Sequence, residues 1–245
     1  MADLVLPRTC GGCGLPGAVL CRSCRVPLTR PRLAQPRRHP PGFPPTVAAG
    51  AYAGPVRPAV LAFKEHGRAE LAGPLGRALA LAVAAVLCGV LEITDGPVLL
   101  VPVPSSVAAV RRRGRDHVRE LADGAVTELR AAGVAAQTVR LLGRASGRGI
   151  RDSAGLDAVA RRGNLAGRFR TLPASWPPRG RVVLVDDVVT SGATLTEAAR
   201  ALRCGPDGAG PWADTPVLAA VVAATPRRPS PPAPTAPAGV ITLRR

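Results

Sequence analysis

Residues 182–195 read VVLVDDVVTSGATL. Their four opening residues are apolar and mostly β-branched, and such a continuous run suits a strand that is buried on both faces of a parallel sheet. Asp186 and Asp187 follow directly, and a turn of small residues then leads into a predicted helix over 194–202. Because ligands of open α/β sheets bind at the carboxyl edge of the strands, this stretch predicts both the fold class and the place of a site.

The turn after the two acids has the composition of a phosphate site. A helix N-terminus presents unpaired N–H groups and the positive end of the helix dipole, and Gly192 lets the backbone approach a ligand closely. The residues expected to hold a phosphate monoester are Thr190, Ser191, Gly192, Ala193 and Thr194. The carboxylates of Asp186 and Asp187 are suited to accept hydrogen bonds from two adjacent ribose hydroxyls. The stretch therefore predicts binding of a sugar phosphate.

Apolar strands and helices alternate along the rest of the chain, which predicts a doubly wound parallel sheet with helices on both faces. Strands are expected at 98–103, 138–142, 181–185 and 217–224, and helices at 56–64, 71–91, 107–132, 157–164 and 194–202. Six prolines between Pro31 and Pro45 indicate an extended linker. The predicted organisation is a cysteine-rich module at 1–30, a linker at 31–48, the main domain at 49–225 and a proline-rich tail at 226–245.

Four of the six cysteines form two CxxC pairs that are separated by seven residues. The pairs are Cys10 with Cys13 and Cys21 with Cys24. Four thiolates at this spacing suit one tetrahedral structural Zn²⁺. A redox CxxC is the competing interpretation, but it would leave the second pair unexplained. The module is therefore predicted to be a zinc ribbon.

The net charge of +17 is typical of proteins that bind nucleic acid. Lys64 is the only lysine, and the abundance of Arg, Ala, Gly and Pro also fits a GC-rich coding bias, so a merely solvated basic surface is the alternative. The apolar run 78–91 has 14 residues, and a membrane span needs about 20. No signal peptide is recognisable, so a cytoplasmic protein without a membrane span is expected. The three histidines lack metal-ligand spacing and are interpreted as solvated or satisfied side chains.

The 182–195 stretch resembles the motif by which type I phosphoribosyltransferases bind 5-phosphoribosyl-1-pyrophosphate (PRPP). In that motif four apolar residues, two acids, two apolar residues and a TTGAT-like turn follow one another. A Walker B strand also ends in acids, but no GxxxxGK[ST] loop occurs in this chain.

The order of further segments resembles the competence protein ComF family over almost the whole chain. The matching segments are the four-cysteine ribbon, residues 52–67, residues 102–104, Arg113 with Gly114, Arg161 with Asn164, and the PRPP-like motif. Two departures are visible. The usual RGFNQ is RGRDHV here, at 113–118, and Ser153 stands where a glutamine is usual.

The resemblance implies a type I phosphoribosyltransferase fold that transfers phosphoribosyl from Mg²⁺-bound PRPP to an acceptor which the sequence does not identify. It assigns a pyrophosphate loop to Val103, Pro104, Ser105 and Ser106, a mobile hood loop to 143–162, and catalytic candidates to Asp186, Asp187, Lys64, Arg113 and Arg161. Purine-salvage relatives carry an aspartate as general base where this chain has Thr190. Two interpretations therefore stay open: transfer to an amine acceptor, or PRPP binding without transfer in a DNA-uptake accessory protein. The resemblance implies DNA-uptake proteins as partners. Single-stranded DNA is a further candidate, because six arginines lie in or near the ribbon: Arg22, Arg25, Arg30, Arg32, Arg37 and Arg38.

Overall fold

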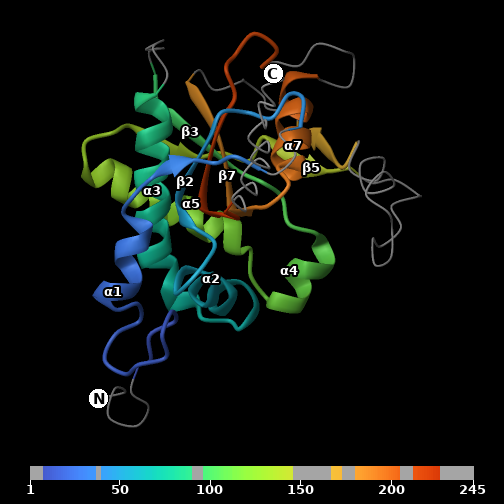
Figure 1. The fold of residues 1–245 in the computed structure, drawn as a ribbon. Helices are drawn as coiled ribbons and strands as arrows, with labels where there is room; N and C mark the ends of the chain where they lie inside the picture. The colour runs from blue at the N-terminus through green and yellow to red at the C-terminus, as the bar shows by residue number, and fades with distance from the viewer. Residues whose placement is uncertain are drawn as a thin grey trace, which may run out of the picture.

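A mixed α/β fold is built around one six-stranded sheet in the computed structural model, which describes residues 8–36, 40–89, 96–145, 167–172, 180–204 and 212–226 (Figure 1). In chain order the elements are α1 (Arg22–Arg25), η2 (Val26–Leu28), β1 (Arg32–Leu33), β2 (Thr46–Ala51), α2 (Val56–Glu65), η3 (Ala69–Leu71), α3 (Ala72–Cys88), β3 (Val98–Pro102), α4 (Val107–Arg113), α5 (His117–Ala131), β4 (Ala136–Thr138), β5 (Leu142–Arg144), β6 (Phe169–Thr171), β7 (Arg181–Val189), α7 (Ala193–Arg203) and β8 (Leu218–Ala224).

The strand order of the main sheet is β1-β2-β8-β7-β3-β4. All neighbours are parallel except β1, which pairs antiparallel with β2. β3 has β4 on one side and β7 on the other, so strands that follow β3 in the chain lie on both sides of it in the sheet. β5 and β6 form a separate antiparallel pair. The predicted α/β class with a mostly parallel sheet is confirmed at this level.

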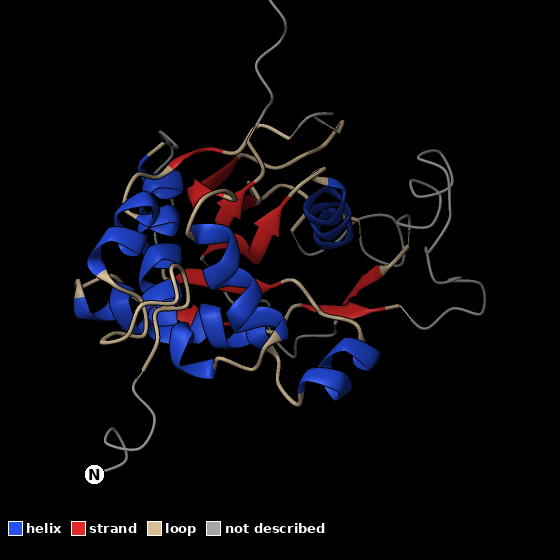
Figure 2. Ribbon diagram, turned by 60° about the horizontal axis from the view of Figure 1, so that its bottom comes forward, coloured by secondary structure: helices blue, strands red, loops and turns tan. Residues whose placement is uncertain are grey.

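Helices cover both faces of the sheet, as Figure 2 shows in blue around the red strands. Alternate residues of β7 account for this division. Val183 and Val185 pack into one hydrophobic cluster with α3 and α5, while Val182 and Leu184 pack into a second cluster with α7. Because both faces are buried, each strand reads as an unbroken apolar run.

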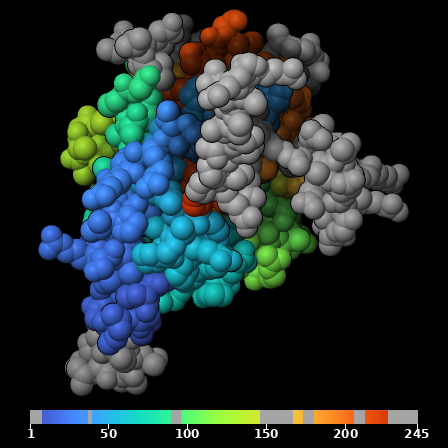
Figure 3. Space-filling model, in the orientation of Figure 1, coloured from blue at the N-terminus to red at the C-terminus, as the bar shows by residue number. Residues whose placement is uncertain are grey.

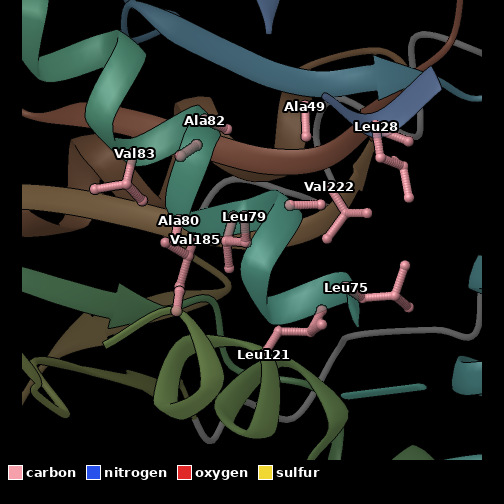
Figure 4. Packing of buried hydrophobic residues seen from close by; sticks show 14 of the residues in the cluster. Leu28, Ala49, Leu75, Leu79, Ala80, Ala82, Val83, Leu121, Val185 and Val222 are labelled. Atoms are coloured by element: carbon pink, nitrogen blue, oxygen red, sulfur yellow. The ribbon is translucent and has the colours of Figure 1, made fainter. Parts of the chain in front are cut away.

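Helix α3 lies at the centre of the first cluster. In Figure 4, Leu75 and Leu79 of α3 lie among Leu121 of α5, Val185 of β7 and Val222 of β8. α3 also crosses α5 at close range, because a Cβ atom added at Gly76 would meet the backbone of Gly124 at 3.0 Å. This close approach explains why glycine occupies the crossing point of both helices.

The stretch Ala69–Cys88 has 20 residues and is apolar enough, by length and composition, to cross a membrane. Half of its most apolar window is buried inside the protein, where it packs on the sheet. The sequence predicted a buried helix here, and a core helix of a soluble protein passes the same test of length and composition.

The single helix predicted over 107–132 is wrong, because the chain forms two helices there. α4 ends at Gly114, whose φ of +68° is a left-handed conformation that glycine adopts readily. α5 then begins after Asp116, whose side chain accepts a hydrogen bond from the Arg119 N–H at 3.3 Å. The residues that end α4 and begin α5 therefore lie within three positions of one another. The chain changes direction between the two helices, and α5 packs against α3.

The strand predicted over 138–142 is also wrong. β4 pairs with β3 and ends at Thr138, whereas Leu142 belongs to β5 in the other sheet. In contrast, the strand predicted over 181–185 is longer than expected, because β8 continues to pair with β7 as far as Val189. Asp186 and Asp187 therefore lie within β7. The helix predicted over 157–164 lies outside the described residues, as does the proline-rich tail beyond Pro226.

The cysteine-rich N-terminal segment packs onto the main domain. Cys10, Leu20, Cys24 and Leu28 belong to the same hydrophobic cluster as α3 and β2. Figure 3 shows this segment in blue at the lower left, against the cyan residues that follow it. The stretch expected as a linker at 31–48 contributes β1 and the first residues of β2 to the sheet. The segment is thus part of the sheet's packing.

Candidate functional site

A cavity of about 410 Å³ opens where β3 and β7 end. These two strands are parallel neighbours, with Pro102 opposite Val185. Its lining residues come from α2, the β3–α4 loop, α4, α5, β5, β6, β7 and α7: Lys64, Val103, Pro104, Ser105, Ser106, Ala109, Arg113, His117, Val118, Arg144, Arg168, Phe169, Asp186, Asp187, Val188 and Thr194. The cavity therefore lies at the edge where α/β sheets bind their ligands.

Asp187 is buried and held by three donors. Its Oδ2 atom lies 2.7 Å from Lys64 Nζ and 3.1 Å from His117 Nε2, and its Oδ1 atom accepts a hydrogen bond from the Val188 N–H at 2.7 Å. Burial by itself raises the pKa of the Asp187 carboxyl, but His117 and Lys64 outweigh it and hold that pKa well below its usual range. Asp187 is therefore a fixed anion at the cavity wall.

The pKa of Asp186 is shifted in the opposite direction from that of Asp187. Its Oδ1 atom accepts a hydrogen bond from the Asp187 N–H at 2.8 Å. Burial, together with the negative charge of Asp187, raises the pKa of Asp186 well above its usual value. A cation or a hydroxyl donor that entered the cavity would relieve this repulsion, so Asp186 is the acid whose charge depends most on a ligand.

Four cations line the same cavity, namely Lys64, Arg113, Arg144 and Arg168. Arg113 Nη2 lies 2.7 Å from Glu65 Oε1, and this hydrogen bond lowers the pKa of Glu65. Burial and the like charge of Arg168 lower the pKa of Arg144. Two guanidinium groups held close together in a partly buried wall favour an anionic ligand.

The turn after β7 is shaped by Gly192. Its φ of +78° is left-handed, and it immediately precedes α7. A Cβ atom there would meet the ring of Phe43 at 2.8 Å and Pro36 at 3.1 Å. Glycine is therefore needed both for the conformation and for the close approach of the chain segment that precedes β2.

Most of the residues predicted from the sequence lie together. Lys64, Arg113, Asp186, Asp187, Thr194 and the four residues of the 103–106 loop all line the cavity. Thr190, Ser191, Gly192 and Ala193 are adjacent to Thr194 in the chain but are not in the lining. In the 103–106 loop, Ser106 caps α4, because its hydroxyl accepts a hydrogen bond from the Ala109 N–H at 3.1 Å. Arg161, Asn164 and Ser153 lie outside the described residues, as does most of the predicted hood loop.

Three ionisable lining residues, namely His117, Arg144 and Arg168, were not among the predicted site residues. The prediction for His117 was a solvated or satisfied side chain; the histidine is buried and bonded to Asp187, which fits the second of these, but its place in the site was not predicted. It stands in the RGRDHV segment, so the departure from the family pattern was the available signal. Arg144 of β5 pairs with Phe169 of β6, and Arg168 directly precedes Phe169; Ala145 N–H donates to Arg168 O at 2.9 Å. Arg144 falls within the predicted hood loop at 143–162, but in an arginine-rich chain no sequence signal marks either arginine as a lining cation.

The four N-terminal cysteines form a second candidate centre. Their Sγ atoms all lie within 4.8 Å of one another, and those of Cys13 and Cys21 are 3.8 Å apart. A tetrahedral zinc ion with Zn–S bonds of about 2.3 Å separates its sulfur ligands by about 3.8 Å. A Cβ atom at Gly12 would meet Cys24 Sγ at 2.8 Å, so glycine keeps the space around this thiol open. The cluster could hold a structural metal such as zinc.

Backbone donors also point at the first thiol of this centre. The N–H groups of Cys21 and Gly12 lie 3.3 and 3.4 Å from Cys10 Sγ. Burial opposes ionisation of this thiol, but hydrogen bonds from the backbone lower the pKa of Cys10 to about 6. Since the thiolate is the metal-binding form, these donors favour ligation.

No family model matches the chain, and no curated protein or solved structure matches it.

Proposed function

We propose that the chain binds PRPP and transfers its phosphoribosyl group to an acceptor, as a type I phosphoribosyltransferase of the ComF kind. One observation carries the proposal. The acid pair near the end of β7, the start of α7 and a group of cations meet around a single cavity. PRPP joins a sugar diol to two strongly anionic groups, so it needs hydrogen-bond acceptors and cations in this combination.

Each part of PRPP has a counterpart in the cavity. The 5′-phosphate is assigned to the 190–194 turn, where the N-terminus of α7 provides N–H donors. The ribose hydroxyls are assigned to Asp186 and Asp187 near the end of β7. The pyrophosphate is assigned to the 103–106 loop together with Lys64 and Arg113. Of the residues in these three groups, Lys64, Arg113, Asp186, Asp187, Thr194 and the 103–106 loop line the cavity.

Transfer breaks the bond between the anomeric carbon and the pyrophosphate oxygen, and pyrophosphate leaves with the electron pair. The acceptor then supplies the pair that forms the new bond. Lys64, Arg113 and Arg144 would stabilise the negative charge that grows on the leaving group, while the anion of Asp187 lies near the positive charge that develops on the sugar. Mg²⁺ bound with PRPP would neutralise further charge on the pyrophosphate, and Asp186 is the carboxylate that would hold it.

The acceptor is expected to be an amine or ammonia. Thr190 occupies the position at which related enzymes carry a catalytic base, and its hydroxyl is no base at neutral pH. An amine attacks without losing a proton beforehand, so it does not require that base. Regulatory PRPP binding without transfer, in a DNA-uptake accessory protein, is the second candidate, and the same missing base favours it.

The N-terminal centre is proposed to hold one structural zinc ion. Four thiolates complete a tetrahedral coordination shell and leave no open position for a substrate. Because Cys10 and Cys24 belong to the hydrophobic core, metal binding would also stabilise the packing of the segment on α3.

A pyrophosphate-release screen separates the two candidates. The full chain is incubated with Mg²⁺ and PRPP, and pyrophosphate is measured in the presence of free bases, ammonia and primary amines. Release that depends on an amine supports transfer. Binding of PRPP without release for any acceptor supports the regulatory function, and absence of binding contradicts both.

A further inference from the structure

His117 and Lys64 both bind Asp187 Oδ2, but the two donors are placed very differently. His117 is the first residue of α5 and is 2% exposed, with Nε2 at 3.1 Å from the carboxylate oxygen. The Lys64 side chain is 30% exposed at the cavity, with Nζ at 2.7 Å. One donor is therefore locked inside the protein, and the other lies at the end of a long, flexible side chain.

We propose that His117 is a positioning residue: it is the fixed donor that holds Asp187, whereas Lys64 is an exchangeable donor that turns to the anionic ligand when it enters. The part of this proposal that concerns Lys64 and the ligand rests on the proposed function. If Lys64 moved away without His117 in place, a buried carboxylate would lose both donors at one oxygen, which is costly. With His117 present, Asp187 keeps its position and its charge.

The surroundings of His117 fix the orientation of its ring. Phe63 of α2 is fully buried, and its ring packs against the imidazole with the centroids 6.3 Å apart and the planes at 61°. The Arg115 guanidinium lies 4.2 Å from the centroid of the Phe63 ring and donates a hydrogen bond to Phe63 O at 3.0 Å. Glu120 of α5 in turn pairs with Arg115 through Nε at 3.0 Å. This chain of contacts ties α2 and α5 together directly behind the imidazole.

The same geometry argues against His117 as the missing general base. A base needs a ring nitrogen that can reach the acceptor. Nε2 is occupied by Asp187, and Nδ1 is buried without a hydrogen-bond partner among the described residues. Because the carboxylate of Asp187 accepts, the hydrogen is assigned to Nε2. The imidazole can therefore orient the acid, but it does not reach the cavity with a free nitrogen.

Two amide substitutions test the fixed donor. In His117→Gln, the terminal amide reaches the position of Nε2 and can still donate to Asp187. In His117→Asn, the shorter amide ends near the position of Nδ1 and cannot. Titration calorimetry with ribose 5-phosphate and with Mg²⁺-PRPP is expected to show a loss of about tenfold or more in affinity for His117→Asn, and recovery of most of it for His117→Gln. Equal losses in both variants would overturn the positioning role.

A second measurement does not need a ligand. Nuclear magnetic resonance of ¹⁵N-histidine in the free full-length protein, assigned by loss of the signal in His117→Gln, is expected to show the hydrogen on Nε2. Lys64→Met should leave this signal unchanged but weaken binding of Mg²⁺-PRPP, whose pyrophosphate is assigned to Lys64, much more than binding of ribose 5-phosphate, which has no pyrophosphate. A hydrogen on Nδ1, or a signal that Lys64→Met abolishes, refutes two independent donors. If neither ligand binds the wild type, the proposed function and the exchange of Lys64 fail together, and the ligand-free spectrum alone decides the His117–Asp187 bond.

Discussion

Replacing Gly192 by alanine tests how the turn before α7 is built. This glycine has a φ of +78°, and a Cβ atom would meet the edge of the Phe43 ring at 2.8 Å. Two costs are therefore expected. An alanine in the left-handed region costs about 1–2 kcal/mol, and overpacking against a partly buried ring adds about 1–3 kcal/mol. The free energy of unfolding should fall by about 2–5 kcal/mol in total.

Gly133 provides a matched control. Its φ is +80°, but a Cβ atom there would have no neighbour within 4 Å. Gly133→Ala should therefore show only the conformational cost of about 1–2 kcal/mol. Comparing the two variants separates the backbone contribution from the contact with Phe43.

Urea denaturation, followed by circular dichroism, measures both changes from the transition midpoints and slopes. The contact with Phe43 is isolated by a double-mutant cycle, because Gly192→Ala should cost clearly less in a Phe43→Ala background, where only the contact with Pro36 at 3.1 Å adds to the conformational cost, than in the wild type. Equal losses for the two glycine variants in the wild-type background, or no coupling to Phe43, would refute the close packing of this segment on the turn.

Metal content, acid stability and DNA affinity give three more measurable outcomes. Cys24→Ser is expected to reduce bound zinc from about one ion per chain to a small fraction, by metal analysis of the purified protein; unchanged zinc contradicts the four-thiolate centre. Asp187 has a depressed pKa, so its contribution to stability is present above the unfolded value of about 3.9 and is lost as the pH falls through the folded value. Asp186 has a raised pKa, so its contribution is lost as the pH rises through the folded value. Thermal unfolding at pH 7 should thus show Asp187→Asn destabilised by about 1.5–3 kcal/mol and Asp186→Asn unchanged or stabilised, and the reverse order would refute the assignment. Replacing Arg22 and Arg25 by glutamine should weaken binding of single-stranded DNA and reduce its salt dependence; unchanged affinity would identify these charges as a solvated surface.

The part of the site that could be predicted is local in sequence. Residues 182–195 contain a buried strand, its acids and the helix start in one continuous run, so short-range rules were sufficient. The strand continues through the acids to Val189 because β8 supplies pairing partners as far as Ala224. Such pairing depends on a distant segment, and a local pattern does not contain it.

The contact that defines Asp187 could not be predicted in this way. His117 is 70 residues away in the chain and Lys64 lies on another helix. They meet because α2 and α5 pack together through Phe63 and Arg115. An isolated histidine has no periodic or spacing signal, so its interpretation as a solvated or satisfied residue missed its part in the site.

In two other segments the sequence contains residues typical of the observed structure, but another feature of the same segment led to a different prediction. Gly114 and Asp116 are ordinary helix stop and start residues, yet the polar, arginine-rich segment around them was predicted as one helix. Likewise, the prolines before β2 indicated a linker, although Arg32 and Leu33 form an edge strand there. Edge strands tolerate nearby prolines because only one side needs hydrogen bonds.

PRPP binding at the cavity is tested most directly by titration calorimetry of the full chain with Mg²⁺-PRPP. We compare the wild type with Asp186→Asn and with Asp214→Asn, which removes an exposed acid that is not in the cavity lining. Loss of a charged hydrogen bond of about 1.5–3 kcal/mol predicts binding about tenfold or more weaker for Asp186→Asn, and unchanged binding for Asp214→Asn. No Mg²⁺-dependent binding by the wild type at about 1 mM ligand, or equal binding by Asp186→Asn, would contradict the proposed PRPP site.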